Sequence, residues 1–194
     1  MRRFAGALCV ALLAPGSLAA QSPESPEACG TLLETLSTQA LPELTLEAPD
    51  FRLEEGACVA EDLFALFDNM RLTAEALRVR YDGPQDFEAP RYARAVELEI
   101  TGLRAAAQTG SMPDLDYALA AQARASEGID ARLLAGFDTG RLVLDALRID
   151  FPGANAIEAR LELTGLSDDP LQALDGRLQR LELSIQSNGL FEQY

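Results

Sequence analysis

Two cysteines, Cys29 and Cys58, carry the most reactive side chains beyond the first twenty residues of the chain. A pair of thiols can act as a reactive site, hold a metal ion or form a structural disulfide. The first two roles would call for a histidine or further cysteines nearby, and the chain contains no histidine. Residues 1–20 have the basic and apolar composition of an export signal. Because an isolated cysteine pair in an exported protein is usually a disulfide, we predict a structural disulfide between them. Closing a loop of this size is worth roughly 3–4 kcal/mol in the chain-entropy account.

Paired carboxylates are the second group of side chains that could do chemistry. Two carboxylic acids can serve as the acid and base of a hydrolase, and clustered oxygen ligands can bind calcium. In a chain this acidic, carboxylates in loops are usually solvent-exposed charge, and no spacing here matches a calcium loop or a G-x-S-x-G nucleophile elbow. We therefore expect no catalytic residue, no metal site and no cofactor, and we predict that the protein is not an enzyme. The closest carboxylate pairs are Glu54/Glu55, Asp114/Asp116 and Asp168/Asp169.

The charged residues restrict the partners further. All 16 basic residues are arginine, and the chain has no lysine and no tryptophan. Without histidine or lysine there is no imidazole base and no amine for a Schiff base. Once the first twenty residues are removed, 14 arginines stand against 31 acidic residues, a net charge of −17. Such a surface repels nucleic acid, so we expect no nucleic-acid partner.

The start of the chain has the organisation of an export signal. Two arginines precede an apolar run over residues 4–14, and a Pro-Gly break separates this run from a small-residue cleavage site. That order predicts a signal peptide over residues 1–20, cleaved after Ala19 or Ala20, and therefore a periplasmic protein. The apolar run is too short to span a bilayer as an anchor, so we expect a mature form that is not membrane-spanning. Residues 21–194 are long enough for one β-rich domain.

Residues 141–166 (RLVLDALRIDFPGANAIEARLELTGL) show the clearest structural pattern. Apolar and polar residues alternate with a period of two, which is typical of a strand with one buried face. A Pro-Gly-Ala-Asn sequence separates two such runs and supplies turn chemistry, so the segment predicts a β-hairpin. The alternating apolar residues are Leu142, Leu144, Ala146, Leu147, Ile149, Phe151, Ile157, Ala159, Leu161 and Leu163.

The hairpin pattern recurs elsewhere in the chain. RLTAEALRVRYDG, which starts at Arg71, aligns with RLVLDALRIDFPG, which starts at Arg141. The return strands VELEITGL (residues 96–103) and ARLELTGL (residues 159–166) match as well. A third copy, GRLQRLELSIQSNG, starts at Gly176. The recurrence predicts a sheet built from repeated hairpins.

Both full copies change the phase of their alternation in the middle. The change falls at Ala76-Leu77 and again at Ala146-Leu147. An extra residue that reverses the alternation is the signature of a β-bulge, and bulges at one level curve a sheet. Arginine recurs where the strands start, and we favour charge pairing across strands over anion binding for these positions. They are Arg71, Arg141 and Arg177.

The other elements follow from the same rules. A short helix is expected over residues 27–40, directly after a proline. Strands are expected over residues 44–53, 58–67, 72–81, 116–125 and 129–137, the last two joined by a tight turn at Glu127-Gly128 into a four-stranded meander with the hairpin. A helix over residues 61–70 competes with the second of these strands. The predicted fold is all-β and mainly antiparallel, a long curved β-meander sheet with hairpin repeats and a short N-terminal helix.

One face of this sheet is expected to be apolar, and it must be covered by something. The sheet could close into an ordinary core, leave a groove for an apolar molecule, or be covered by a second protein. Small residues within 118–125 and 131–135 would leave room for a ligand, or for the helix to pack through Leu32, Leu33 and Leu36. The face residues that could bind a ligand are Leu77, Val79, Leu98, Ile100, Tyr117, Leu119, Leu133, Phe137, Leu147, Ile149, Leu161 and Leu163.

At LRVRYDG…VELEITGL and LRIDFPG…ARLELTGL, the chain resembles the repetitive β-sheet proteins of the Gram-negative periplasm. These include the AsmA-like and related bridge-like lipid-transport families, and uncharacterised alphaproteobacterial periplasmic families such as DUF2125. The resemblance covers about residues 44–189 and rests on pattern. It implies a periplasmic sheet with an apolar concave face and no catalytic residues. This chain is shorter than those proteins and lacks their membrane anchor, which argues against long-range lipid bridging.

The function expected from the sequence is the binding of a lipid or other apolar molecule in the groove of a curved sheet, without catalysis. The sustained apolar face with small residues at its centre is the reason. The alternative is an envelope interaction or scaffold protein whose sheet edge or apolar face docks a partner protein.

Overall fold

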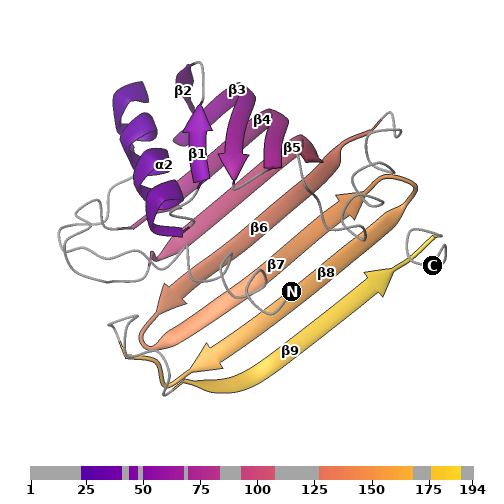
Figure 1. The fold of residues 1–194 in the computed structure, drawn as a ribbon. Helices are drawn as coiled ribbons and strands as arrows, with labels where there is room; N and C mark the ends of the chain where they lie inside the picture. Colours follow the sequence, from indigo (N-terminus) through magenta and orange to yellow (C-terminus); the bar gives the residue numbers. More distant parts are fainter. Residues whose placement is uncertain are drawn as a thin grey trace.

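A computed structural model describes residues 23–40, 44–47, 50–67, 70–83, 93–107, 127–167 and 176–188, which form one helix and a single antiparallel sheet of nine strands (Figure 1). The predicted all-β fold with a short N-terminal helix is therefore confirmed. The strand order is β1-β3-β4-β5-β6-β7-β8-β9, and β2 also pairs with β3. The elements are α2 (Pro26–Ala40), β1 (Leu44–Glu47), β2 (Phe51–Glu54), β3 (Ala57–Phe67), β4 (Met70–Asp82), β5 (Ala95–Ala107), β6 (Ile129–Asp138), β7 (Arg141–Phe151), β8 (Asn155–Thr164) and β9 (Arg177–Gln186).

The predicted hairpin over residues 141–166 is confirmed as β7 and β8. Phe151 pairs with Asn155 at its closed end, across the turn. The turn requires positive φ at Gly153 (81°) and Ala154 (62°), and the Asn155 side chain donates a 2.7 Å hydrogen bond to the carbonyl oxygen of Pro152. The side-chain amide of Asn155 thus provides a hydrogen-bond donor for a carbonyl group in the turn that has no partner in the strand ladder.

The predicted strand over residues 44–53 is wrong in one respect, because it is two strands. β1 and β2 both pair with β3: β1 pairs with the C-terminal part of β3 and β2 with its N-terminal part. The sequence between them contains Pro49, which has no N–H to give to a ladder. The competing helix over residues 61–70 does not form, since most of that segment belongs to β3 and pairs with β4.

The predicted tight turn at Glu127-Gly128 is also wrong. β6, which follows this position, pairs with β5 on one side and with β7 on the other. It therefore has no free edge for a strand that directly precedes it in the sequence. The meander therefore runs from β5 to β6 to β7. The predicted strand over residues 116–125 lies outside the described residues.

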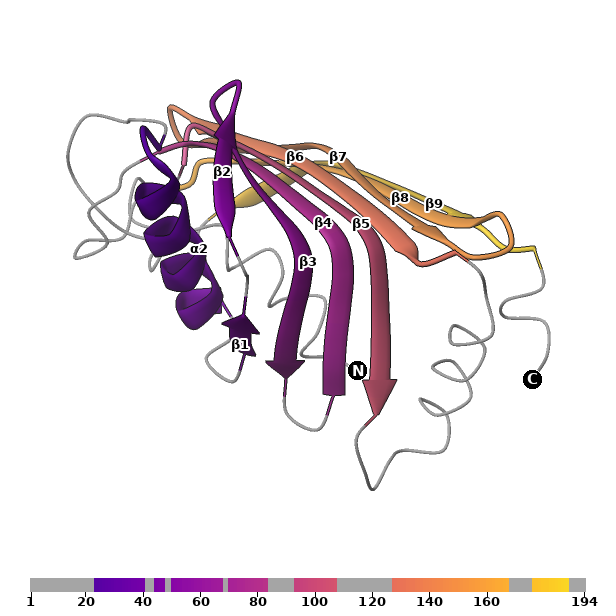
Figure 2. The same ribbon diagram turned by 90° about the horizontal axis from the view of Figure 1, so that it is seen from above.

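The two phase changes predicted two bulges, and a register shift is present at one of them. The register of β7 shifts against β8 between Leu144 and Leu147, which confirms the second predicted bulge. At the first predicted position β4 keeps its register with both neighbours, yet its buried positions switch from Ala74 to Leu77. The neighbouring strands have a positive φ at the same level, 53° at Asp62 on β3 and 64° at Gly102 on β5, so the three strands bend together. Figure 2 shows β3, β4 and β5 bending sharply while β6 to β9 run straighter.

The bend in β5 depends on two glycines. Gly102 has a φ of 64°, and its backbone N–H, released from the ladder, donates a 2.8 Å hydrogen bond to Oδ1 of Asp130 on β6. Gly128 lies so close that an added Cβ would be 2.5 Å from the carbonyl carbon of Gly102 and 2.6 Å from its Cα. Only a residue without a Cβ allows this approach of two backbones.

The core lies at the end of the sheet covered by α2, beside β1 and β2 (Figure 1). The predicted disulfide between Cys29 and Cys58 is present and ties the helix to β3. Tyr81 is 1% exposed at the centre of this core, and burial raises the pKa of its phenol to about 12. The side chain of Leu36 lies outside the described residues. The buried residues of the cluster are Cys29, Leu32, Leu33, Cys58, Ala60, Leu63, Ala74, Leu77, Val79, Tyr81, Ala93 and Val96.

Candidate functional site

Cross-strand pairing aligns the apolar residues of eight strands into continuous rows. Partners that face each other in a ladder point to the same side of the sheet, so each row lies on one face. The first row, called the Leu98 row, is Leu53, Cys58, Val79, Leu98, Leu133, Leu147, Ala159 and Leu183. The second, called the Ile100 row, is Phe51, Ala60, Leu77, Ile100, Ala131, Ile149, Ile157 and Ile185.

The predicted face residues fall into this arrangement. Leu77, Val79, Leu98, Ile100, Leu133, Leu147 and Ile149 belong to the two rows. Leu161 pairs with Leu144 and Leu181, and Phe137 and Leu163 both pair with Leu142, so these three lie on the same face. Tyr117 and Leu119 lie outside the described residues.

The two ends of each row differ in burial: its residues on β3 and β4 are buried, whereas its residue on β9 is exposed. Val79 on β4 is 1% exposed and Leu133 on β6 is 4% exposed. The apolar residues of β7 and β8 are mostly partly buried. On β9, Leu178, Leu181, Leu183 and Ile185 are 56%, 61%, 62% and 58% exposed. The face is thus a packed core beside α2 and open to solvent at β9.

We call this exposed part of the face the open apolar end. It consists of the apolar side chains of β9 together with the partly buried ones beside them on β7 and β8. The third repeat copy, predicted to start at Gly176, forms β9, but its leucines were not among the predicted face residues. The alignment of GRLQRLELSIQSNG with the hairpin was the signal that could have found them. The residues of the open apolar end are Leu142, Leu147, Ile149, Ile157, Leu161, Leu163, Leu178, Leu181, Leu183 and Ile185.

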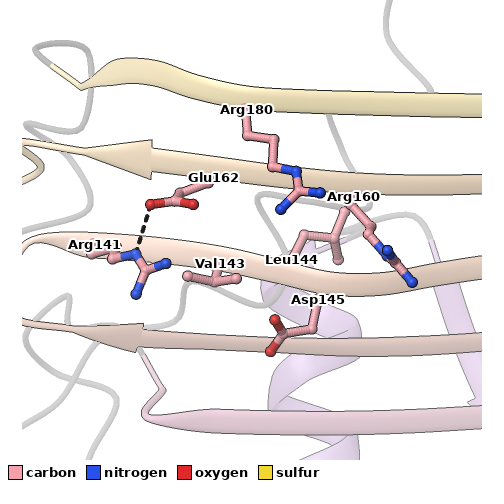
Figure 3. A pocket seen from close by; sticks show the side chains of 7 residues that line it. All are labelled: Arg141, Val143, Leu144, Asp145, Arg160, Glu162 and Arg180. Atoms are coloured by element: carbon pink, nitrogen blue, oxygen red, sulfur yellow. Dashed lines mark hydrogen bonds and ion pairs between the residues drawn. The ribbon is translucent and has the colours of Figure 1, made fainter.

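The opposite face of the same strands is charged and contains a shallow depression of about 320 Å³ (Figure 3). Arg141 donates a 2.8 Å hydrogen bond to Glu162 across β7 and β8, and this contact lowers the pKa of the Glu162 carboxyl. Arg180 and Arg160 both reach Glu182, at 2.5 Å and 3.7 Å. The depression is lined by Arg141, Val143, Leu144, Asp145, Arg160, Glu162 and Arg180.

Charge pairing is the interpretation favoured from the sequence, and it holds for Arg141, whose guanidinium forms an ion pair with the carboxylate of Glu162. Arg71 instead lies over the ring of Phe64, with its guanidinium carbon 4.9 Å from the ring centroid. Arg177 is exposed at the start of β9. The three repeated arginines therefore serve different local roles.

The carboxylate pairs considered for catalysis are not assembled into a site in the described part of the chain. Glu54 contacts Arg52 at 3.4 Å and Glu55 contacts Arg78 at 3.7 Å, so each is paired with an arginine. The pairs at 114/116 and 168/169 lie outside the described residues. Among the residues that the structure describes, no three acidic, cysteine or histidine side chains are grouped to hold a metal ion. No helix in that part of the chain has the length and apolarity to cross a membrane.

Glu97 links three strands on the charged face, and its ion pairs predict how the stability of the fold changes at low pH. It accepts a hydrogen bond of 2.8 Å from Arg132 on β6 and one of 2.9 Å from Arg80 on β4. The hydrogen bond from Arg132, followed by the charges of both arginines, lowers the pKa of Glu97. A depressed pKa stabilises the fold above the pKa of the unfolded chain, near pH 4.3, and this contribution is lost as the pH falls through the folded-state pKa.

We therefore expect Glu97→Gln to lower the free energy of unfolding at pH 7 by up to about 1 kcal/mol, a value discounted for exposure to solvent. The difference from the parent protein should shrink steadily below about pH 5. Urea unfolding at several pH values measures it. Glu99→Gln is the matched control, since Oε1 of Glu99 lies 3.8 Å from Nε of the same Arg132, a longer contact than either of those that Glu97 makes. A pH-independent difference for Glu97→Gln would contradict the assignment.

Comparison with models of protein families, with curated proteins and with solved structures returns no match to this chain. The resemblance to AsmA-like and related periplasmic proteins therefore stays a prediction.

Proposed function

We propose that this chain is an exported, non-enzymatic protein that binds a lipid or another apolar molecule at the open apolar end of its sheet. One observation carries the proposal. The Leu98 and Ile100 rows continue without interruption from a packed core into a strand whose four large apolar side chains are each more than half exposed. Exposed apolar surface that is contiguous over several strands marks a binding surface far more often than do scattered single residues.

The shape of the surface suits an extended apolar chain. Ten residues of strand rise about 33 Å, and three neighbouring strands span about 10 Å across the sheet. An acyl chain lying along β8 or β9 would contact aliphatic side chains over its whole length. Burying each of these side chains would release free energy of about 25 cal/mol per Å² of apolar area removed from water.

The predicted export of the chain supports the same proposal. The predicted signal peptide and the disulfide between Cys29 and Cys58 both fit an oxidising compartment such as the periplasm. A compartment bounded by two membranes supplies lipids.

Binding of a neutral naphthylamine probe, which fluoresces in apolar surroundings, tests the proposal. We expect Leu183→Gln to weaken binding roughly five- to tenfold, because it removes one large aliphatic side chain from the open face. Ser184→Gln is the matched control, since Ser184 is the next residue of β9 and pairs with Glu158 on the charged face. A fatty acid should displace the probe, and organic extraction of the purified protein should recover lipid.

Comparison of probe affinity in the two variants tests whether the probe binds to the apolar face. Equal affinity for the probe in Leu183→Gln and Ser184→Gln would contradict the proposal, because the two side chains point to opposite faces. A purified protein that yields no lipid and binds no probe would contradict it as well.

A second candidate function is the docking of a protein partner, and the position of β9 favours it. Among the described strands β9 pairs only with β8, so one side of its backbone is an open edge. An extended segment can add to such an edge through main-chain hydrogen bonds.

A further inference from the structure

The edge strand β9 is unusually suited to pairing with another strand. It is ten residues long, and every one of them is exposed. Proteins usually protect such an edge with proline, lysine, a very short strand or a charge on the apolar face. The sequence of β9, RLQRLELSIQ, has no proline and no lysine, and its charged residues pair with partners on the charged face.

The other end of the described sheet is protected. There the edge position is shared by β1 and β2, each four residues long, and α2 packs against both (Figure 1). Short edge strands covered by a helix are poor templates for an added strand. Of the two ends, only β9 presents a long edge.

We propose that β9 pairs antiparallel with β9 of a second copy of this chain, with Leu181 on the two-fold axis. This interaction does not depend on the ligand proposed above. In that register Arg180 of each copy lies opposite Glu182 of the other, so two pairs of opposite charge form across the axis. Cross-strand neighbours have Cβ atoms about 5 Å apart, within reach of an arginine and a glutamate.

Adjacent registers lack this complementarity. A register centred on Arg180 or on Glu182 places two like charges opposite each other, which destabilises a strand pair. A register centred on Leu183 places no pair of charges opposite each other. Leu181 also lies at the middle of β9 (Arg177–Gln186), so its register pairs nearly the whole strand.

The apolar residues match in the same register. The extra residue that shifts β9 against β8 between Glu162 and Leu163 also brings Leu178 of one copy opposite Leu183 of the other. The side chains that are most exposed in one copy thus gain apolar neighbours. Because the contact is the same patch on both copies and the other end of the sheet is protected, the assembly closes at two.

Charge-reversal variants of the full chain test the inference by sedimentation velocity. The parent protein should show a concentration-dependent monomer–dimer equilibrium. Arg180→Glu and Glu182→Arg should each raise the dimer dissociation constant at least about tenfold, because each makes both cross-axis pairs repulsive. Arg148→Glu is the matched control: Arg148 is also an exposed, ion-paired arginine, but it lies on β7, away from the edge, and should leave the constant unchanged.

Mixing the two single variants separates pairing from any effect on folding. An Arg180→Glu copy and a Glu182→Arg copy present opposite charges to each other at both positions, so they should form a heterodimer while neither self-associates. Native mass spectrometry resolves the heterodimer by mass. A parent chain that stays monomeric at all concentrations, an equal effect of Arg148→Glu, or a mixture that forms no heterodimer would each overturn the inference.

Discussion

The double variant Cys29→Ala/Cys58→Ala is expected to unfold about 6–16 °C below the parent protein. The disulfide joins residues 29 positions apart, and losing it restores roughly 3–4 kcal/mol of chain entropy to the unfolded state. For a domain of this size each kcal/mol shifts the melting temperature by about 2–4 °C. Differential scanning calorimetry or circular dichroism during heating measures the shift.

The position of the bond makes this effect structural as well as entropic. Cys29 and Cys58 are 0% and 1% exposed, and they join α2 to the rows of the sheet that it covers. Denaturant unfolding of the parent protein with and without reductant provides the control, since it removes the bond without changing the sequence. A variant that melts with the parent, together with no effect of the reductant, would show that the helix is held by packing alone.

Gly128→Ala is expected to lower the free energy of unfolding by about 1–3 kcal/mol, the usual cost of forcing extra atoms into a closely packed site. The added Cβ would meet the backbone of Gly102, at 2.5 Å from its carbonyl carbon and 2.8 Å from its oxygen. A backbone cannot move aside as a flexible side chain can. Separation of β5 from β6 would also disturb the hydrogen bond from Gly102 to Asp130.

Gly30→Ala is the matched control, with the opposite expected sign. Gly30 lies inside α2, and a Cβ there would come no closer than 3.5 Å to Phe51, an ordinary van der Waals contact. Alanine is favoured over glycine inside a helix by roughly 0.5–1 kcal/mol, so this variant should be slightly more stable than the parent. Urea unfolding of both variants measures the pair, and a loss of stability in Gly30→Ala as large as in Gly128→Ala would contradict the steric explanation.

Period-two alternation was enough to predict the all-β fold and the hairpin of β7 and β8, because both depend on residues close in sequence. The disulfide followed from the number of cysteines and the absence of histidine. The neighbour of β6 could not be predicted in the same way. Residues 108–128 separate β5 from β6 in the sequence, and the pairing of the two strands depends on contacts that are distant in sequence. Gly128 was expected to permit a tight turn, whereas it permits the close approach of β5.

The candidate site was predicted only in part for the same reason. The repeat identified the apolar residues of β7 and β8, and pairing places them in rows with those of β4 and β5. The repeat did not reveal that the strand starting at Arg177 lies at the end of the sheet. Strand order is a long-range property, and it decides which apolar residues are covered and which are exposed.

The decline in burial from α2 to β9 also sets the order in which the sheet comes apart. Side chains of the core cluster around Tyr81 connect the first strands to the helix, and we expect this part to open only when the whole molecule unfolds. In a single copy of the chain, β9 is held by one ladder of hydrogen bonds to β8, and its side chains are exposed to solvent. Its amide protons should therefore exchange with solvent soonest among those of the described strands. A strand that detaches at a low cost in free energy can exchange one pairing partner for another while the rest of the molecule stays folded.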